Sequence, residues 1–311
     1  MRFSACLVMA AAVAAGGCAV PSHTAPLDTL EVSHIQWYGF AGVVCRLDDP
    51  HDRSATVDYL DEVAQFTNLA HVCVLEPDLT EELERISAAQ ARALLDVTLL
   101  LFEAVPGDSP SGSGWRFVLR EDAEQMWRDF LLTNRGVLTA DHVAAIYLID
   151  EPVWNGATAA DIEAAAAMVH RDLPATPALI VEAADVLGQA VFPPTVSWIG
   201  FDSYGIADPV SDPAYRADLA RLSEMAVPGQ RLVLIADTQW HPFYREAGLE
   251  PEDMAQVAAG YAELAADTPA VVAMIGYSWP GGIDGARQWG ARDLPASLGR
   301  VLRAIGDQIL E

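Results

Sequence analysis

Short runs of apolar residues alternate along the chain with longer segments that have the apolar spacing of helices. The densest run, Val143–Ile149, carries no charged position and is typical of a strand buried on both faces, not of an amphipathic helix. It stops at two adjacent carboxylates, Asp150 and Glu151, and Pro152 then removes a backbone donor and ends the strand. The alanine-rich segment Thr158–Arg171 predicts a helix. One strand followed by one helix is therefore the predicted unit.

This unit recurs from residue 32 to the end of the chain. Apolar runs predict eight strands, over Val32–Phe40, Thr67–Leu75, Val97–Glu103, Val143–Ile149, Pro177–Ala183, Val196–Ser203, Arg231–Asp237 and Ala270–Trp279. Helical spacing predicts helices over Thr56–Gln65, Asp78–Leu95, Arg120–Leu132, Thr158–Arg171, Pro213–Met225, Pro251–Ala266 and Ala296–Leu310. The connection between the fifth and sixth strands, residues 185–195, is short and ends in two prolines, so a fifth helix there is at most vestigial.

Eight buried strands alternating with helices predict an α/β fold, a single (β/α)8 TIM barrel over residues 31–311. A doubly wound open sheet is the alternative, but no glycine-rich dinucleotide turn follows the first predicted strand. Hydrophobic residues make up 52% of the 311 residues, which is enough for one large core without a second domain.

The N-terminal segment has the pattern of an export signal. Arg2 precedes an apolar run, Ala5–Ala15, that ends in Gly16-Gly17-Cys18 and is far shorter than the ~20 residues needed to span a bilayer. The small residues before Cys18 resemble a bacterial lipoprotein signal, in which the cysteine is lipidated; ordinary secretion is the alternative. We therefore expect a signal peptide over residues 1–18, a tether over 19–30, and an exported protein held in the cell envelope only through lipid on Cys18.

Net charge and cysteine content restrict the kinds of partner, cross-link and metal site that we expect. A net charge of −26 argues against nucleic acid and anionic membrane surfaces, and all 18 basic residues are arginine. Cys45 and Cys73 remain after the signal segment, and in an oxidising compartment a disulfide between them or two buried free thiols are both open. No Cys and His spacing predicts a zinc site, and we predict no metal and no cofactor.

Acids follow the apolar runs at five of the eight predicted carboxyl ends, where a barrel carries its ligand site. These acids are Glu103, Asp150, Glu151, Glu182, Asp202 and Asp237. Aromatic and amide residues accompany them, and we predict that a substrate contacts Asp150 together with Trp37, Tyr38, Tyr204, Gln239, Trp240, Tyr277 and Trp279. Asn68 or His71 of the second strand are further candidates. Capping and packing are the structural alternatives for each, since polar residues also mark strand ends.

Several carboxylates ringed by tryptophan and tyrosine favour cleavage of a glycosidic bond, which needs one proton donor and one carboxylate. Asp150-Glu151-Pro152 resembles the Asn-Glu-Pro motif of the large clan of retaining (β/α)8 glycoside hydrolases, and Trp279 resembles the sugar-platform tryptophan of that clan. The resemblance implies that Glu151 is the catalytic acid/base and that the substrate is a carbohydrate.

The chain differs from that clan at two positions. Asp150 replaces the asparagine, and Asp237 stands where the resemblance implies a nucleophilic glutamate. Asp237 or Asp202 is therefore the expected partner of Glu151 as nucleophile or base.

Two other hypotheses stay open. A divalent metal bound by Glu103, Glu151 and Asp202 is one of them, because hard cations take oxygen ligands. A non-catalytic carbohydrate-binding or cell-surface barrel lipoprotein is the other, and the missing glutamate favours it. No Gly-x-Ser-x-Gly motif is present, which argues against a serine hydrolase.

Overall fold

The computed structural model describes residues 27, 30–54 and 56–311. The predicted signal peptide, its Cys18 and most of the tether lie outside the described residues. No helix of the described chain combines the length and the apolar character needed to cross a membrane.

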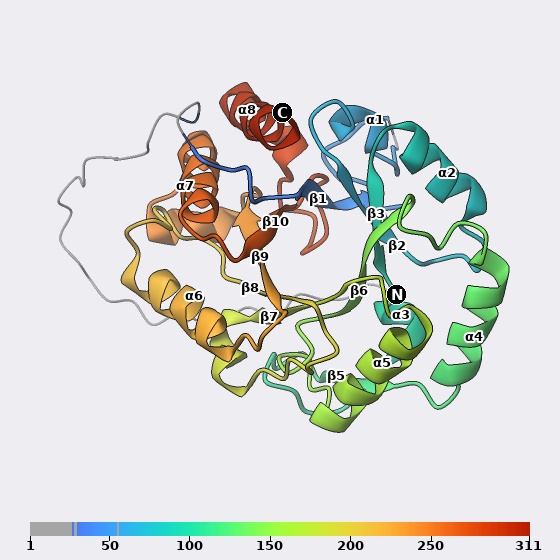
Figure 1. Ribbon diagram of the computed structural model, residues 1–311. Helices are drawn as coiled ribbons and strands as arrows, with labels where there is room; N and C mark the ends of the chain where they lie inside the picture. Colours follow the sequence, from blue (N-terminus) through green and yellow to red (C-terminus); the bar gives the residue numbers. More distant parts are fainter. Residues whose placement is uncertain (1–26, 28–29, 55) are drawn as a thin grey trace.

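Eight parallel strands close into a barrel, which confirms the predicted fold (Figure 1). The order around the barrel is β1-β10-β9-β8-β7-β6-β3-β2. The strands are β1 Trp37–Val44, β2 Leu69–Cys73, β3 Arg92–Asp96, β6 Val143–Asp150, β7 Ala178–Ala183, β8 Trp198–Asp202, β9 Arg231–Asp237 and β10 Val271–Tyr277.

Helices surround this ring of strands (Figure 1). They are α1 Leu60–Val63, α2 Thr80–Ala88, α3 Thr98–Leu101, α4 Ala123–Asn134, α5 Ala159–Asp172, α6 Pro213–Met225, α7 Met254–Ala266 and α8 Ala296–Leu310. Between β7 and β8 the chain forms a short 3-10 helix, η2 Ala184–Gln189, and three more lie in loops: η3 Pro242–Ala247, η4 Pro251–Asp253 and η5 Ala291–Asp293.

The core has two parts, as the alternation of side chains along each strand requires. In β9, Val233 and Ile235 belong to the cluster that fills the barrel, whereas Leu232 and Leu234 belong to the cluster between sheet and helices. This alternation decides which side chains at the carboxyl ends of the strands face the barrel mouth.

The predicted third strand is wrong. The barrel strand is β3, Arg92–Asp96, and Val97–Glu103 forms α3 and the start of a hairpin. The helix predicted over Asp78–Leu95 ends early because the chain turns at Gln90, which has a positive φ of 61°. The short run Ala93–Leu95 is fully apolar and fits either a helix end or a buried strand, so periodicity alone did not separate the two.

The hairpin pairs β4 Phe102–Pro106 with β5 Trp115–Leu119, outside the barrel sheet. Glu103 lies in this hairpin opposite Val118. It is therefore not on a barrel strand, contrary to the prediction. The predicted loop Pro106–Gly114 is mostly the tip of this hairpin.

Candidate active site

Glu151 directly follows β6 at the barrel mouth. Its N–H donates to the Val181 carbonyl at 2.8 Å, and its own carbonyl accepts the Asn155 N–H at 2.9 Å. Its φ of +44° is in the left-handed region, which costs a non-glycine residue about 1–3 kcal/mol, and such strained residues cluster at functional sites. The backbone therefore turns sharply at the residue that carries the candidate acid.

Glu151 and Asp202 form a hydrogen-bonded carboxyl pair across the mouth. Burial raises the pKa of Glu151 well above its usual range, and the charges of Asp202 and Asp150 raise it further. Burial also raises the pKa of Asp202, as does the charge of Asp150, while the hydrogen bond from Glu151 lowers it. The hydrogen bond raises the pKa of Glu151 and lowers that of Asp202, so Glu151 is the donor of the pair, while both carboxyls keep a raised pKa.

Aromatic hydroxyls orient the acids on the β8 and β10 side. The Tyr204 hydroxyl donates to Asp202 Oδ2 at 3.1 Å. The Tyr204 ring stacks on Tyr277 with centroids 5.1 Å apart, and the Tyr277 hydroxyl donates to Asp284 Oδ2 at 3.1 Å. The structure thus brings Asp202, Tyr204 and Tyr277 together, as predicted from the strand ends.

Asp150 connects the pair to the β2 and β3 side. The Tyr147 hydroxyl donates to its Oδ1. Burial raises the pKa of Asp150 to about 6; the charge of Asp96 adds to this, whereas the Tyr147 hydrogen bond and the charge of His71 lower it. Asp150 therefore belongs to the same electrostatic cluster as Glu151.

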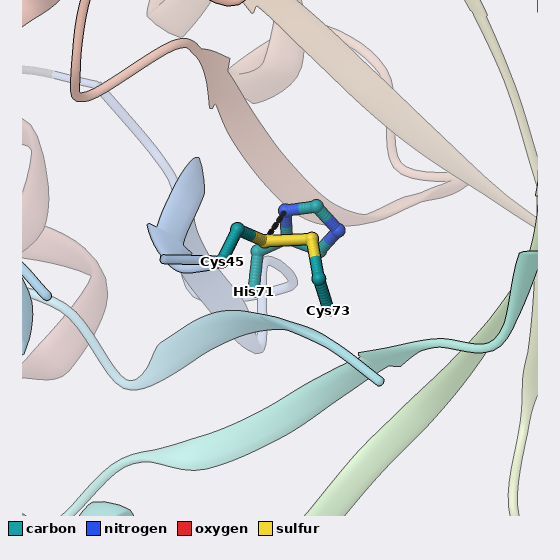
Figure 2. A group of neighbouring side chains, drawn as sticks. All are labelled: Cys45, His71 and Cys73. Atoms are coloured by element: carbon teal, nitrogen blue, oxygen red, sulfur yellow. Dashed lines mark hydrogen bonds between the residues drawn. A yellow bond between two sulfur atoms is a disulfide. The ribbon is translucent and has the colours of Figure 1, made fainter. Parts of the chain in front are cut away.

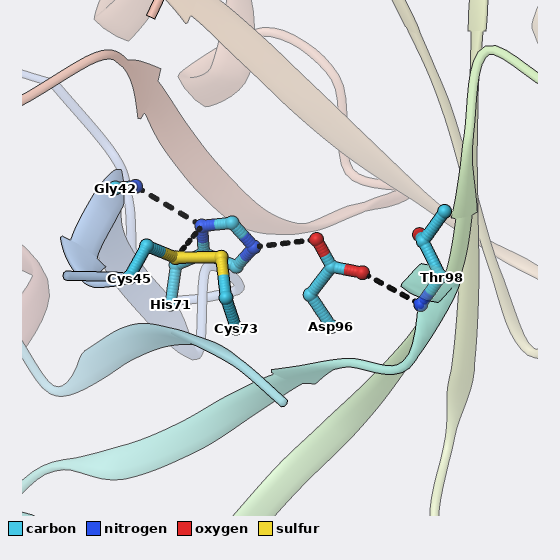
Figure 3. The surroundings of a disulfide bond; sticks show 6 residues. All are labelled: Gly42, Cys45, His71, Cys73, Asp96 and Thr98. Atoms are coloured by element: carbon cyan, nitrogen blue, oxygen red, sulfur yellow. Dashed lines mark hydrogen bonds and ion pairs between the residues drawn. A yellow bond between two sulfur atoms is a disulfide. The ribbon is translucent and has the colours of Figure 1, made fainter. Parts of the chain in front are cut away.

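A disulfide between Cys45 and Cys73 joins the end of β1 to the end of β2 (Figure 2). The imidazole of His71 lies beside it, with Nδ1 3.6 Å from Cys45 Sγ (Figure 2). Nδ1 accepts the Gly42 N–H at 3.0 Å, and Nε2 lies 3.5 Å from Asp96 Oδ2 (Figure 3). The disulfide is formed, so the free-thiol alternative is wrong.

Glu182 supports the loop that carries Glu151 and does not face the mouth. It alternates with the inward-facing Val181 on β7, and its carboxylate accepts the backbone N–H groups of Val153 at 2.9 Å, Trp154 at 3.2 Å and Ala183 at 3.0 Å. Burial raises its pKa to about 7, opposed by these three hydrogen bonds.

Asp237 is fully buried and tied to neighbouring loops. Its Oδ2 accepts the Gly205 N–H at 2.8 Å, and its Oδ1 accepts the Tyr244 hydroxyl at 3.0 Å. Burial raises its pKa to about 7, opposed by hydrogen bonds from Gly205, Tyr244 and Gln239. The carboxylate that contacts Glu151 is therefore that of Asp202.

Four aromatic residues predicted to contact substrate do not lie at the mouth. Trp37 and Tyr38 open β1, since this strand starts five residues later than predicted, and the Tyr38 hydroxyl donates outward to Leu302 of α8 at 3.2 Å. Trp279 lies beyond the end of β10, where the alternation no longer holds, and its Nε1 donates to Glu62 of α1 at 2.7 Å.

Trp240 is also withdrawn from the mouth. It is buried, and its Nε1 donates to the Leu249 carbonyl at 3.2 Å. Gln239 is buried as well and accepts a hydrogen bond from Gln288, whose side chain also reaches Asp284 at 3.5 Å. Gln239 is therefore one side chain removed from the mouth.

The described residues contain one compact group of possible metal ligands. The ligand atoms of Cys45, His71 and Cys73 lie within 4.8 Å of one another, but the two cysteines are joined in the disulfide, and no other described group of three acids, histidines or cysteines is so compact. With Glu103 in the hairpin, the hypothesis of a metal bound by Glu103, Glu151 and Asp202 is contradicted.

Three residues of the mouth were not predicted. Asp96 ends a strand that periodicity merged into a helix, Tyr147 lies within an apolar run, and Asp284 lies in the loop after β10. Tyr147, three residues before Asp150 in a strand of otherwise aliphatic residues, was the one visible indication in the sequence.

The sequence matches no protein-family model and none of the curated proteins. Among solved structures, a β-glucuronidase from an uncultured Clostridium sp. is similar with a TM-score of 0.59 and 11% identity, over 88% of this chain and 50% of that chain. A β-D-glucuronidase from Dictyoglomus thermophilum gives 0.57 and 14%, over 88% and 51%. A GH113 β-1,4-mannanase gives 0.55 and 11%, over 88% and 98%.

This chain therefore spans about half the length of the two glucuronidases and nearly the whole mannanase. At such low identities the likeness establishes the barrel fold. It does not establish the chemistry, because barrels carry many activities.

Proposed function

We propose that this protein is a glycoside hydrolase in which Glu151 donates the proton to the glycosidic oxygen and Asp202 is its carboxylate partner. The observation that carries the proposal is the buried carboxyl pair that Glu151, directly after β6, forms with Asp202 at the end of β8. A buried acid with a raised pKa beside a second carboxyl group is the arrangement that glycosidic cleavage uses. The glycoside hydrolases among the similar barrels support the same chemistry.

The pair must separate for the reaction. Carboxyl groups lie ~5–5.5 Å apart in retaining enzymes and ~6.5–9.5 Å apart in inverting ones, farther than a hydrogen bond. The glycosidic oxygen enters between them and replaces Asp202 as acceptor of the Glu151 proton. Asp202, still held by the Tyr204 hydroxyl, then faces the anomeric carbon or the attacking water.

Replacing Glu151 tests this role. Glu151→Gln removes the transferable proton, so hydrolysis should fall by about 10²–10⁴-fold while glycan binding persists. Glu103→Gln makes the same chemical change in the hairpin and is the matched control. Reducing-end release from a panel of neutral, amino and acidic glycans measures both; an active Glu151→Gln protein would contradict the proposal.

A non-catalytic carbohydrate-binding barrel is the second candidate. It is favoured by Asp237, which replaces the glutamate of the resembling clan and is held by Gly205 and Tyr244. In that case the unmodified protein binds glycans and releases no reducing ends from any of them.

We also propose that the protein is exported and anchored through lipid on Cys18. The Cys45–Cys73 disulfide supports this, because such bonds persist in oxidising compartments and are rare in the cytosol.

A further inference from the structure

A cavity lies at the amino-terminal end of the barrel, opposite the mouth. Its volume is about 330 Å³, which is within the range of small-molecule sites. The residues that line it stand at or beside the first residues of the barrel strands, among them Trp37 of β1, Arg92 of β3, Trp198 of β8 and Arg231 of β9. The candidate active site uses none of these four.

The four side chains form the first inward-facing layer of the barrel. On β9, Arg231 has the parity of Val233, which belongs to the cluster that fills the barrel. On β3, Arg92 likewise has the parity of Leu94, a member of that cluster. The two tryptophans belong to the cluster or pack against it. Barrel interiors are normally closed by layers of bulky apolar side chains, whereas this layer contains two arginines and an open volume.

The cavity is positively charged although the protein is acidic. Arg92 forms no ion pair within the described chain, and its guanidinium lies 5.4 Å from the centre of the Trp37 ring. Arg231 donates to the carbonyls of Ala270 at 3.1 Å and Pro269 at 3.0 Å, which orients its guanidinium without neutralising it. None of the described residues that line the cavity is acidic. The described lining therefore carries two positive charges and no negative one.

This lining favours a ligand with a carboxylate on a sugar ring. An arginine guanidinium binds a carboxylate through two parallel hydrogen bonds. The faces of the tryptophan rings pack against the apolar face of a sugar. Gln36, which is exposed, and Thr176, which is half-buried, add uncharged hydrogen-bonding groups for hydroxyls and open the cavity to solvent. An aromatic acid would leave these two groups unused, and an inorganic anion would leave the tryptophans unused.

We propose that this cavity is a second binding site, for an acidic sugar such as a uronic acid residue of a glycan. It is separate from the candidate active site and does not depend on the proposed hydrolase function. Trp37, which the sequence predicts as a substrate contact at the mouth, contacts sugar at the opposite end of the barrel instead.

Calorimetric titration of the unmodified protein with glucuronate and galacturonate tests the proposal. At least one of them should bind at least about tenfold more tightly than glucose or galactose, which have the same ring without the charge, and high salt should reduce the difference. Benzoate and inorganic phosphate are titrated in the same way. Equally tight binding of either anion overturns the assignment of a sugar.

Variants assign the binding to this cavity. Arg92→Gln should weaken uronate binding by about tenfold or more, and Trp37→Leu should weaken it as well. Arg216→Gln, the loss of one exposed positive charge on α6, is the matched control and should leave binding unchanged. Failure of both uronates to bind, or equal affinity of the unmodified protein and Arg92→Gln, overturns the proposal.

A crystal structure of the unmodified protein with the tighter uronate decides the matter if Arg92→Gln does not fold. A carboxylate within hydrogen-bond distance of Arg92 or Arg231 supports the proposal. A uronate bound only at the mouth or elsewhere on the surface overturns it.

Discussion

A carboxylic acid that donates a proton near neutral pH must still be protonated at that pH, so its pKa must be raised. Glu151 does so through burial and through the negative charges of Asp202 and Asp150, which disfavour its ionised form. Glu151 also has a left-handed backbone, with a φ of +44°. One residue thus combines an uncommon backbone conformation with a raised pKa.

Asp237 should control stability and not the proton transfer. Its folded pKa is about 7 against an ordinary 3.8, so the folded state binds the proton more tightly and stability falls as pH rises from about 4 to 7. In Asp237→Asn this side chain cannot titrate. We therefore expect its free energy of unfolding to fall by up to about 1.4 kcal/mol less per pH unit than that of the unmodified protein. Melting temperature against pH measures this, with exposed Asp129→Asn as the charge-matched control; parallel curves for the unmodified protein and Asp237→Asn would contradict it.

The sequence predicts which acids follow the strands but not the directions in which their side chains point. Glu151 and Asp202 were identified because each follows an apolar run, whereas the choice between Asp202 and Asp237 depends on contacts made by distant loops. Tyr277 and Trp279 have the same parity, yet the strand ends at Tyr277, so only Tyr277 faces the mouth. Alternation carries no information past the last paired residue.

Two inserted elements pack together beside the acid. The β4–β5 hairpin is bonded to the loop after Glu151 by the Ser111 N–H to the Trp154 carbonyl at 3.0 Å and the Phe117 N–H to the Asn155 carbonyl at 2.7 Å. Gly156 lies at this contact with a φ of +77°. The hairpin therefore packs against the loop that follows Glu151 and holds it in place.

Gly156→Ala should weaken the packing of the β4–β5 hairpin against the loop after Glu151. A left-handed alanine costs about 1–2 kcal/mol, and its Cβ would lie 2.8 Å from Arg116 Cβ and 3.0 Å from Ser109 Cβ, adding about 1–3 kcal/mol of overpacking. Gly114→Ala is the matched control, because it has the same φ of +77° with nothing within 4 Å. Urea unfolding should show the larger loss for Gly156→Ala; equal losses would mean that the contact is not tight.

The third strand marks the limit of periodicity at the scale of elements. Long helices such as α5 and α8 were predicted nearly to the residue, since their apolar stripes run over several turns. The apolar part of β3 spans three residues directly after a helix, and the following apolar segment, which forms α3, resembles a strand in composition. A short buried strand has no periodic signature of its own.

At the scale of the molecule, the barrel places its acids at one end and pairs its remaining cysteines. The disulfide closes a separation of 28 residues between the first two strands, beside His71. Composition and strand count were sufficient to predict the closed barrel, because eight buried strands with intervening helices have few other arrangements. The grouping of acids at the mouth could not be predicted from the sequence, because it joins residues from β3 to the loop after β10.

Cys18→Ser tests the proposed anchor. Without the thiol no lipid can be attached, so the protein should move from the membrane fraction to the soluble fraction and lose lipid labelling. Cys6→Ser is the matched control, because it lies within the predicted signal peptide. Membrane retention of Cys18→Ser would contradict the proposal.

The pH dependence of glycan hydrolysis tests the Glu151–Asp202 pair most directly. Glu151 must be protonated to act, so activity falls as pH rises through its raised pKa. In Asp202→Asn the negative charge beside Glu151 is gone, and we expect the alkaline limb of the rate profile to move to lower pH by about one unit or more, together with a lower maximal rate. An alkaline limb at the same pH in both proteins would contradict the shared proton on which the account depends.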